Sequence, residues 1–195
     1  MLLRLSGRAP RLSGGARVHY SVDITLAAPR QIAVEAGAIV ARHAWLNALG
    51  PSDEPVLLIG KGAAIGRNNV ISAKNRIEIG ADVVTAPQVL IMDHGHAFEN
   101  PAIPVLRQGV SEGGTIIIEP GCWIGFGAVI VCNRGELRVG RNSVVGANAV
   151  VTSSIPPLSV AVGSPARVVR QYSQELGRWE RVGEGAHAEG SVART

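Results

Sequence analysis

Two histidines and two carboxylates are crowded into one short segment, "IMDHGHAFENP" at 91–101. Asp93, His94, His96 and Glu99 lie within seven residues. Because imidazole titrates near neutral pH, a histidine can take a proton from a hydroxyl group and return it, and a nearby carboxylate can hold the ring in place. The cluster therefore indicates general acid–base chemistry at His96 or His94, against the commoner role of a histidine as a structural residue.

The elements that must position this cluster are marked by an aliphatic residue at every sixth place, as in Ile118, Ile124 and Ile130. A helix has no period of six, and a simple strand alternates at every second place. Three hexads instead close one triangular coil, whose sides are short strands and whose corners are turns that glycine or asparagine can make. Coils stacked in parallel form a β-solenoid. We expect an all-β fold of about five coils, starting at Val34, Ile59, Ile79, Ile118 and Val139.

The hexads stop at the histidine cluster. Residues 97–115 form one long loop, and loops beyond about 12–15 residues are uncommon unless they are functional or disordered. Pro101 and Pro104 would stiffen this loop, and Ile103 and Leu106 would need a surface to pack on. We therefore expect an arm that reaches over a neighbouring subunit, with His96 at its base.

Composition and charge limit the other possibilities. Four of the 19 basic residues lie in the acid-free segment 1–22, and the rest of the chain carries 15 basic and 15 acidic residues, so no nucleic-acid-binding surface is expected. No apolar run is long enough to span a membrane. Two cysteines without a CxxC spacing are typical of reduced thiols in a cytoplasmic protein. We expect a flexible basic segment at 1–22, a β-solenoid domain at 23–172, and a tail at 173–195 with a short helix near 174–182 and a disordered end.

Three stretches resemble the hexapeptide-repeat acyltransferases, and among them the O-acetyltransferases of galactosides, maltose and bacterial surface polysaccharides. They are "APQVLIMDHGHAFENPAIPV" (86–105), "IEPGCWIGFGAVIV" (118–131) and "VGRNSVVGANAVVTSSIPPLSVAVGSPARVVRQY" (139–172). The resemblance implies a left-handed parallel β-helix and a homotrimer with active sites between subunits. It also implies direct transfer of an acetyl group from acetyl-CoA to a sugar hydroxyl, without a metal or an acyl-enzyme.

The resemblance implies particular site residues as well. Counting from Ala86 in the first stretch places the family's catalytic base at His96, with His94 as its competitor; Asp93 or Glu99 would orient the ring. Acetyl-CoA would contact residues along a groove between subunits: Gly125, Phe126, Ala147, Thr152, Ser153, Arg167 and Arg170. For the acceptor sugar we expect contacts from Ser72, Asn75, Asp93 and Trp123.

The sequence departs from the family pattern at three of these positions. Sugar acetyltransferases often carry asparagine where this chain has Ser72, a small or polar residue where it has Phe126, and lysine where it has Ser153. The acceptor therefore stays open: a surface-polysaccharide sugar is our first expectation, and an antibiotic or small glycoside the second. A non-enzymatic solenoid for assembly or binding is a further alternative. A zinc carbonic anhydrase of the same architecture would need histidines from later coils, and after His96 the sequence has only His187.

Overall fold

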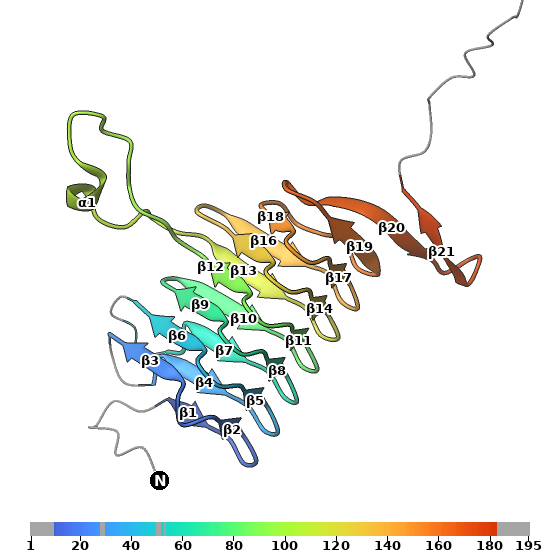
Figure 1. Ribbon diagram of the computed structural model, residues 1–195, viewed down its shortest axis with the longest axis horizontal. Coiled ribbons are helices and arrows are strands. Elements are labelled where there is room, and N and C mark those ends of the chain that lie inside the picture. Colours follow the sequence, from blue (N-terminus) through green and yellow to red (C-terminus); the bar gives the residue numbers. More distant parts are fainter. Residues whose placement is uncertain (1–9, 28–29, 50–51, 53, 183–195) are drawn as a thin grey trace, which may run out of the picture.

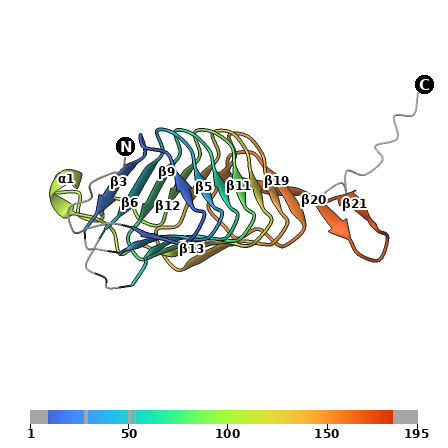
Figure 2. The same ribbon diagram turned by 90° about the horizontal axis from the view of Figure 1, so that it is seen from below.

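Stacked triangular coils make up most of the molecule. The computed structural model describes residues 10–27, 30–49, 52 and 54–182. Three sheets, one for each side of the coil, run along the stack (Figures 1 and 2). Over six coils each sheet receives one strand per coil, and these strands are parallel. The predicted β-solenoid is confirmed, with one coil more than the five expected.

The strands alternate among the three sheets in chain order. Sheet A contains β1 (Arg11–Leu12), β4 (Ile32–Val34), β7 (Leu57–Ile59), β10 (Arg76–Ile79), β13 (Thr115–Ile118) and β16 (Glu136–Val139). Sheet B contains β2 (Arg17–Val18), β5 (Ile39–Val40), β8 (Ala64–Ile65), β11 (Val84–Thr85), β14 (Trp123–Ile124), β17 (Val144–Val145), β19 (Ser159–Val162), β20 (Arg167–Ser173) and β21 (Arg178–Arg181). Sheet C contains β3 (Asp23–Leu26), β6 (Trp45–Ala48), β9 (Val70–Ala73), β12 (Leu90–Met92), β15 (Val129–Val131) and β18 (Val150–Val151).

Aliphatic side chains fill the interior because every sixth residue points inward. Ile79, Ile118 and Val139 are in register on β10, β13 and β16 and are buried. Small residues such as Ala63 and Ala128 face the same narrow interior and are also fully buried. Each large aliphatic side chain that is buried in this way contributes about 1.5–3 kcal/mol. Over the described residues, the buried core built from these layers contains no aromatic side chain.

The coils approach one another so closely at the corners that some positions admit only glycine. A Cβ atom on Gly60 would lie 2.7 Å from the carbonyl carbon of Gly80 in the next coil, closer than real Cβ atoms come to other atoms. At other corner positions the backbone enters the left-handed region, as at Asn68 and Asn148, and asparagine tolerates this conformation better than most residues. These two requirements explain the glycine and asparagine that follow the repeated aliphatic residues.

The first coil lies within the segment that the sequence analysis assigned to a flexible terminus. Strands β1 and β2 lie inside 1–22, and the main-chain N–H of Arg17 donates to the carbonyl of Ala38 in the next coil at 2.8 Å. The prediction of flexibility is therefore wrong for residues 11–22, while residues 1–9 lie outside the described part of the chain. The missed signal is a hexad: Leu12, Val18 and Ile24 are six residues apart.

The segment after the last coil forms a β-hairpin where a short helix was predicted. Strands β20 and β21 pair in antiparallel fashion, with Tyr172 opposite Trp179 and their rings 5.6 Å apart. Gly177 takes a positive φ of 63° at the turn, which a helix does not allow. The hairpin projects beyond the coils (Figure 1). Residues 183–195, predicted to be disordered, lie outside the described residues.

The predicted long loop is present between β12 and β13, and it projects from the side of the stack (Figure 1). It contains a single helical turn, α1 (Val105–Gln108), with no buried residue. Ile103 and Leu106 are exposed, Leu106 by 86%. Within the described residues, no helix has the length and apolar character needed to cross a membrane.

Candidate functional site

The loop leaves and rejoins the solenoid through a narrow neck. The main chains of His96 and Val110 pair as an antiparallel bridge, and the main-chain N–H of Ser111 donates to the carbonyl of Gly95 at 2.8 Å. The hydroxyl of Ser111 in turn accepts the main-chain N–H of Gly95 at 2.9 Å. The two sides of the loop are therefore tied together at the position of His96.

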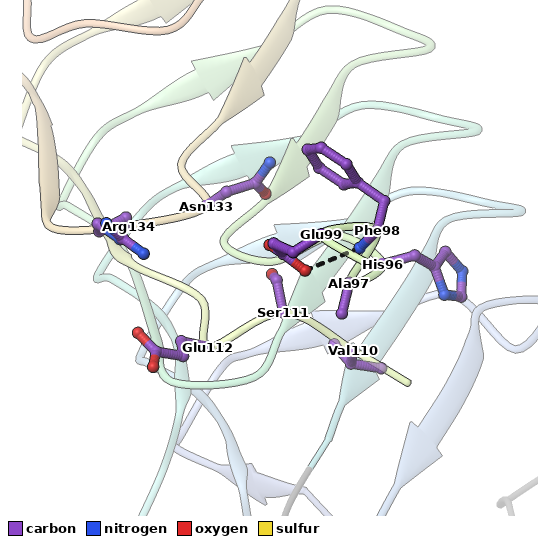
Figure 3. A pocket seen from close by; sticks show the side chains of 9 residues that line it. All are labelled: His96, Ala97, Phe98, Glu99, Val110, Ser111, Glu112, Asn133 and Arg134. Carbon is purple, nitrogen blue, oxygen red and sulfur yellow. Dashed lines mark hydrogen bonds between the residues drawn. The ribbon is translucent and has the colours of Figure 1, made fainter. Parts of the chain in front are cut away.

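His96 is exposed and stands at the edge of a hollow of about 490 Å³ beside the neck. Its imidazole points away from Asn133 and Arg134, which line the opposite side of the same hollow (Figure 3). Among the described residues, the ring finds no hydrogen-bond partner. Glu99, one of the two carboxylates expected to orient it, accepts instead the main-chain N–H of Phe98 at 2.9 Å. The imidazole is therefore free to meet a group from outside the chain.

Asp93, the other carboxylate of the cluster, is fully buried and serves the backbone. Its Oδ1 atom accepts the main-chain N–H of Lys74, and its Oδ2 atom accepts those of Asn75 and Arg76, all at 2.8 Å. Its own carbonyl accepts the main-chain N–H of Gly114 at 2.6 Å, where the loop returns. Asp93 thus anchors both ends of the loop to the coil below.

His94 is buried beside Asp93, with only 8% of its surface exposed. Its Nδ1 atom lies 2.8 Å from Oδ1 of Asp93, and its Nε2 atom lies 3.5 Å from the hydroxyl of Ser72. That hydroxyl accepts a hydrogen bond from Nδ2 of Asn47 at 2.8 Å, while Oδ1 of Asn47 is buried without a partner. The order Ser–His–Asp matches that of a hydrolase triad, but Ser72 is 2% exposed and already accepts the Asn47 bond, so a substrate carbonyl has no access to it.

The residues expected at the acceptor are therefore only partly brought together. Ser72 and Asp93 belong to the buried network, and Asn75 uses its Nδ2 atom to bond the carbonyl of Glu112 at 2.8 Å across the neck. Trp123 lies apart, on the outer face of sheet B, and is 52% exposed. Asn47 was not among the predicted site residues, although the register of β6 with β9 places it directly beside Ser72.

The residues expected to contact acetyl-CoA do not lie together within one protomer. Gly125, Phe126 and Ala147 share the corner between sheets B and C, where the carbonyl of Phe126 accepts the main-chain N–H of Asn148 at 2.8 Å. Thr152 and Ser153 follow the opposite end of β18 and are exposed. Arg167 and Arg170 are exposed on β20. The main-chain N–H groups of Phe126 and Ala147 have no acceptor within the described part of the chain.

Two further titratable groups have perturbed pKa values. Burial raises the pKa of the Cys122 thiol, which packs in the core as the sequence pattern predicts for a small inward residue. A hydrogen bond to Glu136, and then one to Glu119, raises the pKa of the Arg138 guanidinium on sheet A. Over residues 10–27, 30–49, 52 and 54–182, no three His, Cys, Asp or Glu side chains gather in a way that could hold a metal ion.

Comparison with curated proteins finds acetyltransferases. The chain is 38% identical over 130 residues to a probable acetyltransferase of Mycobacterium tuberculosis, covering 66% of this chain and 42% of that protein. It is 30% identical over 136 residues to a putative lipopolysaccharide biosynthesis O-acetyl transferase of Escherichia coli, covering 63% of this chain and 67% of that protein. It is 34% identical to the galactoside O-acetyltransferase of Escherichia coli, over 70% of this chain and 64% of that protein. The chain thus spans under half of the first relative and about two thirds of the other two. No family model matches the chain.

Solved structures with low sequence identity share the fold. An N-acyltransferase from Bacillus cereus, in complex with dTDP and 3-hydroxybutyryl-CoA, superposes with a TM-score of 0.67 at 16% identity, covering 84% of each chain. A maltose O-acetyltransferase from Clostridium difficile superposes with a TM-score of 0.56 at 24% identity, over 84% of this chain and 70% of that one. These similarities support the solenoid architecture across nearly the whole described part of the chain.

Proposed function

Since this chain belongs to the hexapeptide-repeat acyltransferase family, we propose that it transfers an acetyl group from acetyl-CoA to a hydroxyl group of a sugar. Two of the relatives are named as a galactoside O-acetyltransferase and a putative lipopolysaccharide biosynthesis O-acetyl transferase. We infer a sugar of a surface polysaccharide as the acceptor, and a cytoplasmic location, which two free cysteines suit.

His96 is the proposed general base. The observation that carries this choice is the contrast between the two histidines: His96 is exposed with a free ring, whereas both ring nitrogens of His94 face buried partners. His96 would take the proton of the acceptor hydroxyl as its oxygen attacks the thioester carbonyl carbon. The bond from that carbon to sulfur then breaks, and the thiolate receives the proton from the imidazolium.

The corner between sheets B and C is the proposed seat of the donor. The unpaired main-chain N–H groups of Phe126 and Ala147 can donate hydrogen bonds to the amide carbonyls of a pantetheine arm that lies along the corner. Exposed Arg167 and Arg170 can pair with the phosphates at the nucleotide end. Phe126 would then stand at the thioester end of the arm.

Three copies of the chain are proposed to form the working unit. The outer face of sheet B carries an apolar stripe in which Ile39, Val84 and Trp123 are exposed by 36–52%. A second apolar row, from Trp45 to Val150, runs in register along sheet C. Extended apolar surfaces of this kind are rare on monomers. Packing the sheet B stripe of one protomer against the next protomer would cover these apolar surfaces. In that arrangement His96 of one protomer would face the corner between sheets B and C of its neighbour.

A thiol-release assay with acetyl-CoA and a panel of neutral and charged sugars tests the proposal. We expect acceptor-dependent release of CoA that falls by at least a hundredfold in His96→Ala, because general-base catalysis contributes about 10²–10⁴-fold. Lys61→Ala, at an exposed corner between sheets A and B and outside the proposed donor and acceptor positions, is the control and should keep the parent's rate. Equal turnover by parent and His96→Ala would remove His96 from the mechanism, and absence of release with every acceptor would favour a binding or assembly protein.

A further inference from the structure

The corner between sheets B and C carries two arginines in adjacent coils. We call this the B/C corner, and it consists of residues 41–43, 66–68, 86–88, 125–127 and 146–148. The main-chain N–H of Asn68 donates to the carbonyl of Arg42 at 3.2 Å, and that of Gln88 donates to the carbonyl of Arg67 at 3.1 Å. The corner is therefore a continuous ladder on which Arg42 and Arg67 occupy equivalent positions.

The two guanidinium groups have no negative partner within the chain as described. Both side chains are exposed, neither forms an ion pair with a described residue, and the B/C corner contains no Asp or Glu. The main chains of neighbouring coils lie about 4.8 Å apart, so Arg42 and Arg67 project from adjacent positions on the corner. An anion bound at this corner could therefore be reached by both guanidinium groups.

The equivalent corner between sheets A and B shows the same backbone with the anions present. There the main-chain N–H of Lys61 donates to a carboxylate oxygen of Glu35 at 3.0 Å, and that of Arg141 donates to one of Glu119 at 2.8 Å. At the B/C corner the corresponding N–H groups, those of Arg42 and Arg67, find no acceptor in the described ranges. The solenoid corner thus has a place for an oxyanion, which the chain fills on one edge and leaves open on the other.

A hollow of about 490 Å³ lies over this part of the B/C corner, within the 300–1,000 Å³ typical of small-molecule sites. It is lined by Arg42, His43, Arg67, Asn68, Pro87, Gln88 and Phe126. Phe126 also stands at the thioester end of the proposed donor position, and Ala147 continues the corner on its other side. The two arginines therefore lie where the acceptor, and not the donor, would be bound.

We propose that Arg42 and Arg67 form an anion subsite for the acceptor, so that the acetylated sugar is an acidic one carrying a phosphate or a carboxylate. The planar guanidinium fork suits both groups, and the free N–H groups of the two arginines add donors at the base of the hollow. This inference rests on the proposed function, because the position of the donor defines which side of Phe126 receives the acceptor.

Equilibrium binding of matched sugars to the full chain tests the subsite directly. The probes are a hexose 1-phosphate, a hexuronate and the neutral methyl hexoside of the galactose and glucose series, titrated at fixed salt. We expect an anionic member of at least one series to bind ten or more times tighter than its neutral counterpart, and the preferred anion distinguishes phosphate from carboxylate. Arg42→Gln and Arg67→Gln should each weaken that binding about tenfold, the order expected for the loss of one charge-assisted contact.

Arg141→Gln is the matched control, because Arg141 occupies the same turn position at the corner between sheets A and B. It should bind the anionic sugars as the parent does. Equal affinity for neutral and anionic sugars in both series, or unchanged affinity in Arg42→Gln and Arg67→Gln, would overturn the subsite even if neutral sugars are acetylated. If anionic sugars bind through the arginines but no acceptor releases CoA, the transferase proposal fails, and the two arginines form an anion-binding site that has no role in acetyl transfer.

Discussion

Replacing Asp93 with asparagine should destabilise the protein by about 2–4 kcal/mol. The carboxylate accepts three main-chain N–H bonds at 2.8 Å and faces Nδ1 of His94 at the same distance. An asparagine side chain has one acceptor oxygen, so at least one of the N–H groups of residues 74–76 would face an NH₂ group. Each unsatisfied donor costs about 1–3 kcal/mol, and the remaining bonds lose their charge assistance. The loss is a large fraction of a typical stability of about 5–15 kcal/mol.

Urea unfolding at a fixed protomer concentration measures this loss, since the midpoint of a self-associating protein depends on concentration. An unchanged slope with a lower midpoint would show that stability alone has changed. Glu180→Gln is the control: its carboxylate pairs at 3.4 Å with exposed Arg178, and such a surface pair contributes about 0–1 kcal/mol. If Asp93→Asn and Glu180→Gln unfold at the same urea concentration, Asp93 does not anchor the neck, and its place beside His94 needs another explanation.

Three further outcomes follow from particular contacts. Gly60→Ala should lose about 1–3 kcal/mol in the same unfolding assay because its Cβ would meet the backbone of the next coil, whereas Gly14→Ala, with nothing within 4 Å, should change little. Burial raises the pKa of the Cys122 thiol above its ordinary 9.0. The buried neutral thiol therefore contributes its full stability below about pH 9, and this contribution is lost at higher pH as the thiol of the unfolded chain ionises. In Cys122→Ala the free energy of unfolding should fall less between neutral and alkaline pH than it does in the parent. Trp123→Arg should lower the molar mass measured by light scattering toward that of one chain, and an unchanged mass would exclude the sheet B stripe as the contact between copies.

The solenoid was predictable because its signal repeats. An aliphatic residue at every sixth position indicates the same triangular coil many times along the sequence. The coils of the structure match this repeat at almost every position used for the prediction. The first coil escaped notice because only three aliphatic residues, Leu12, Val18 and Ile24, mark it among arginines and glycines. The C-terminal hairpin was not predicted because its segment contains no repeat. The contact between Tyr172 and Trp179 depends on a turn that local sequence propensity does not indicate.

The histidine cluster shows why the site was harder to predict than the fold. A carboxylate next to two histidines in sequence suggests a partner for the ring, but here the long loop replaces the turn between β12 and β13 that would have stacked on the turn after β9 in the coil below. The main-chain N–H groups of Lys74, Asn75 and Arg76 lie at that lower turn, and Asp93 satisfies all three. The carboxylate of Asp93 therefore binds the main chain of the coil below, and it also contacts His94 in the same buried network. His96, two residues further along, lies beyond this network and keeps a free ring. The interruption therefore creates the need for a buried carboxylate and, at its outer edge, a place where an unattached imidazole can do chemistry.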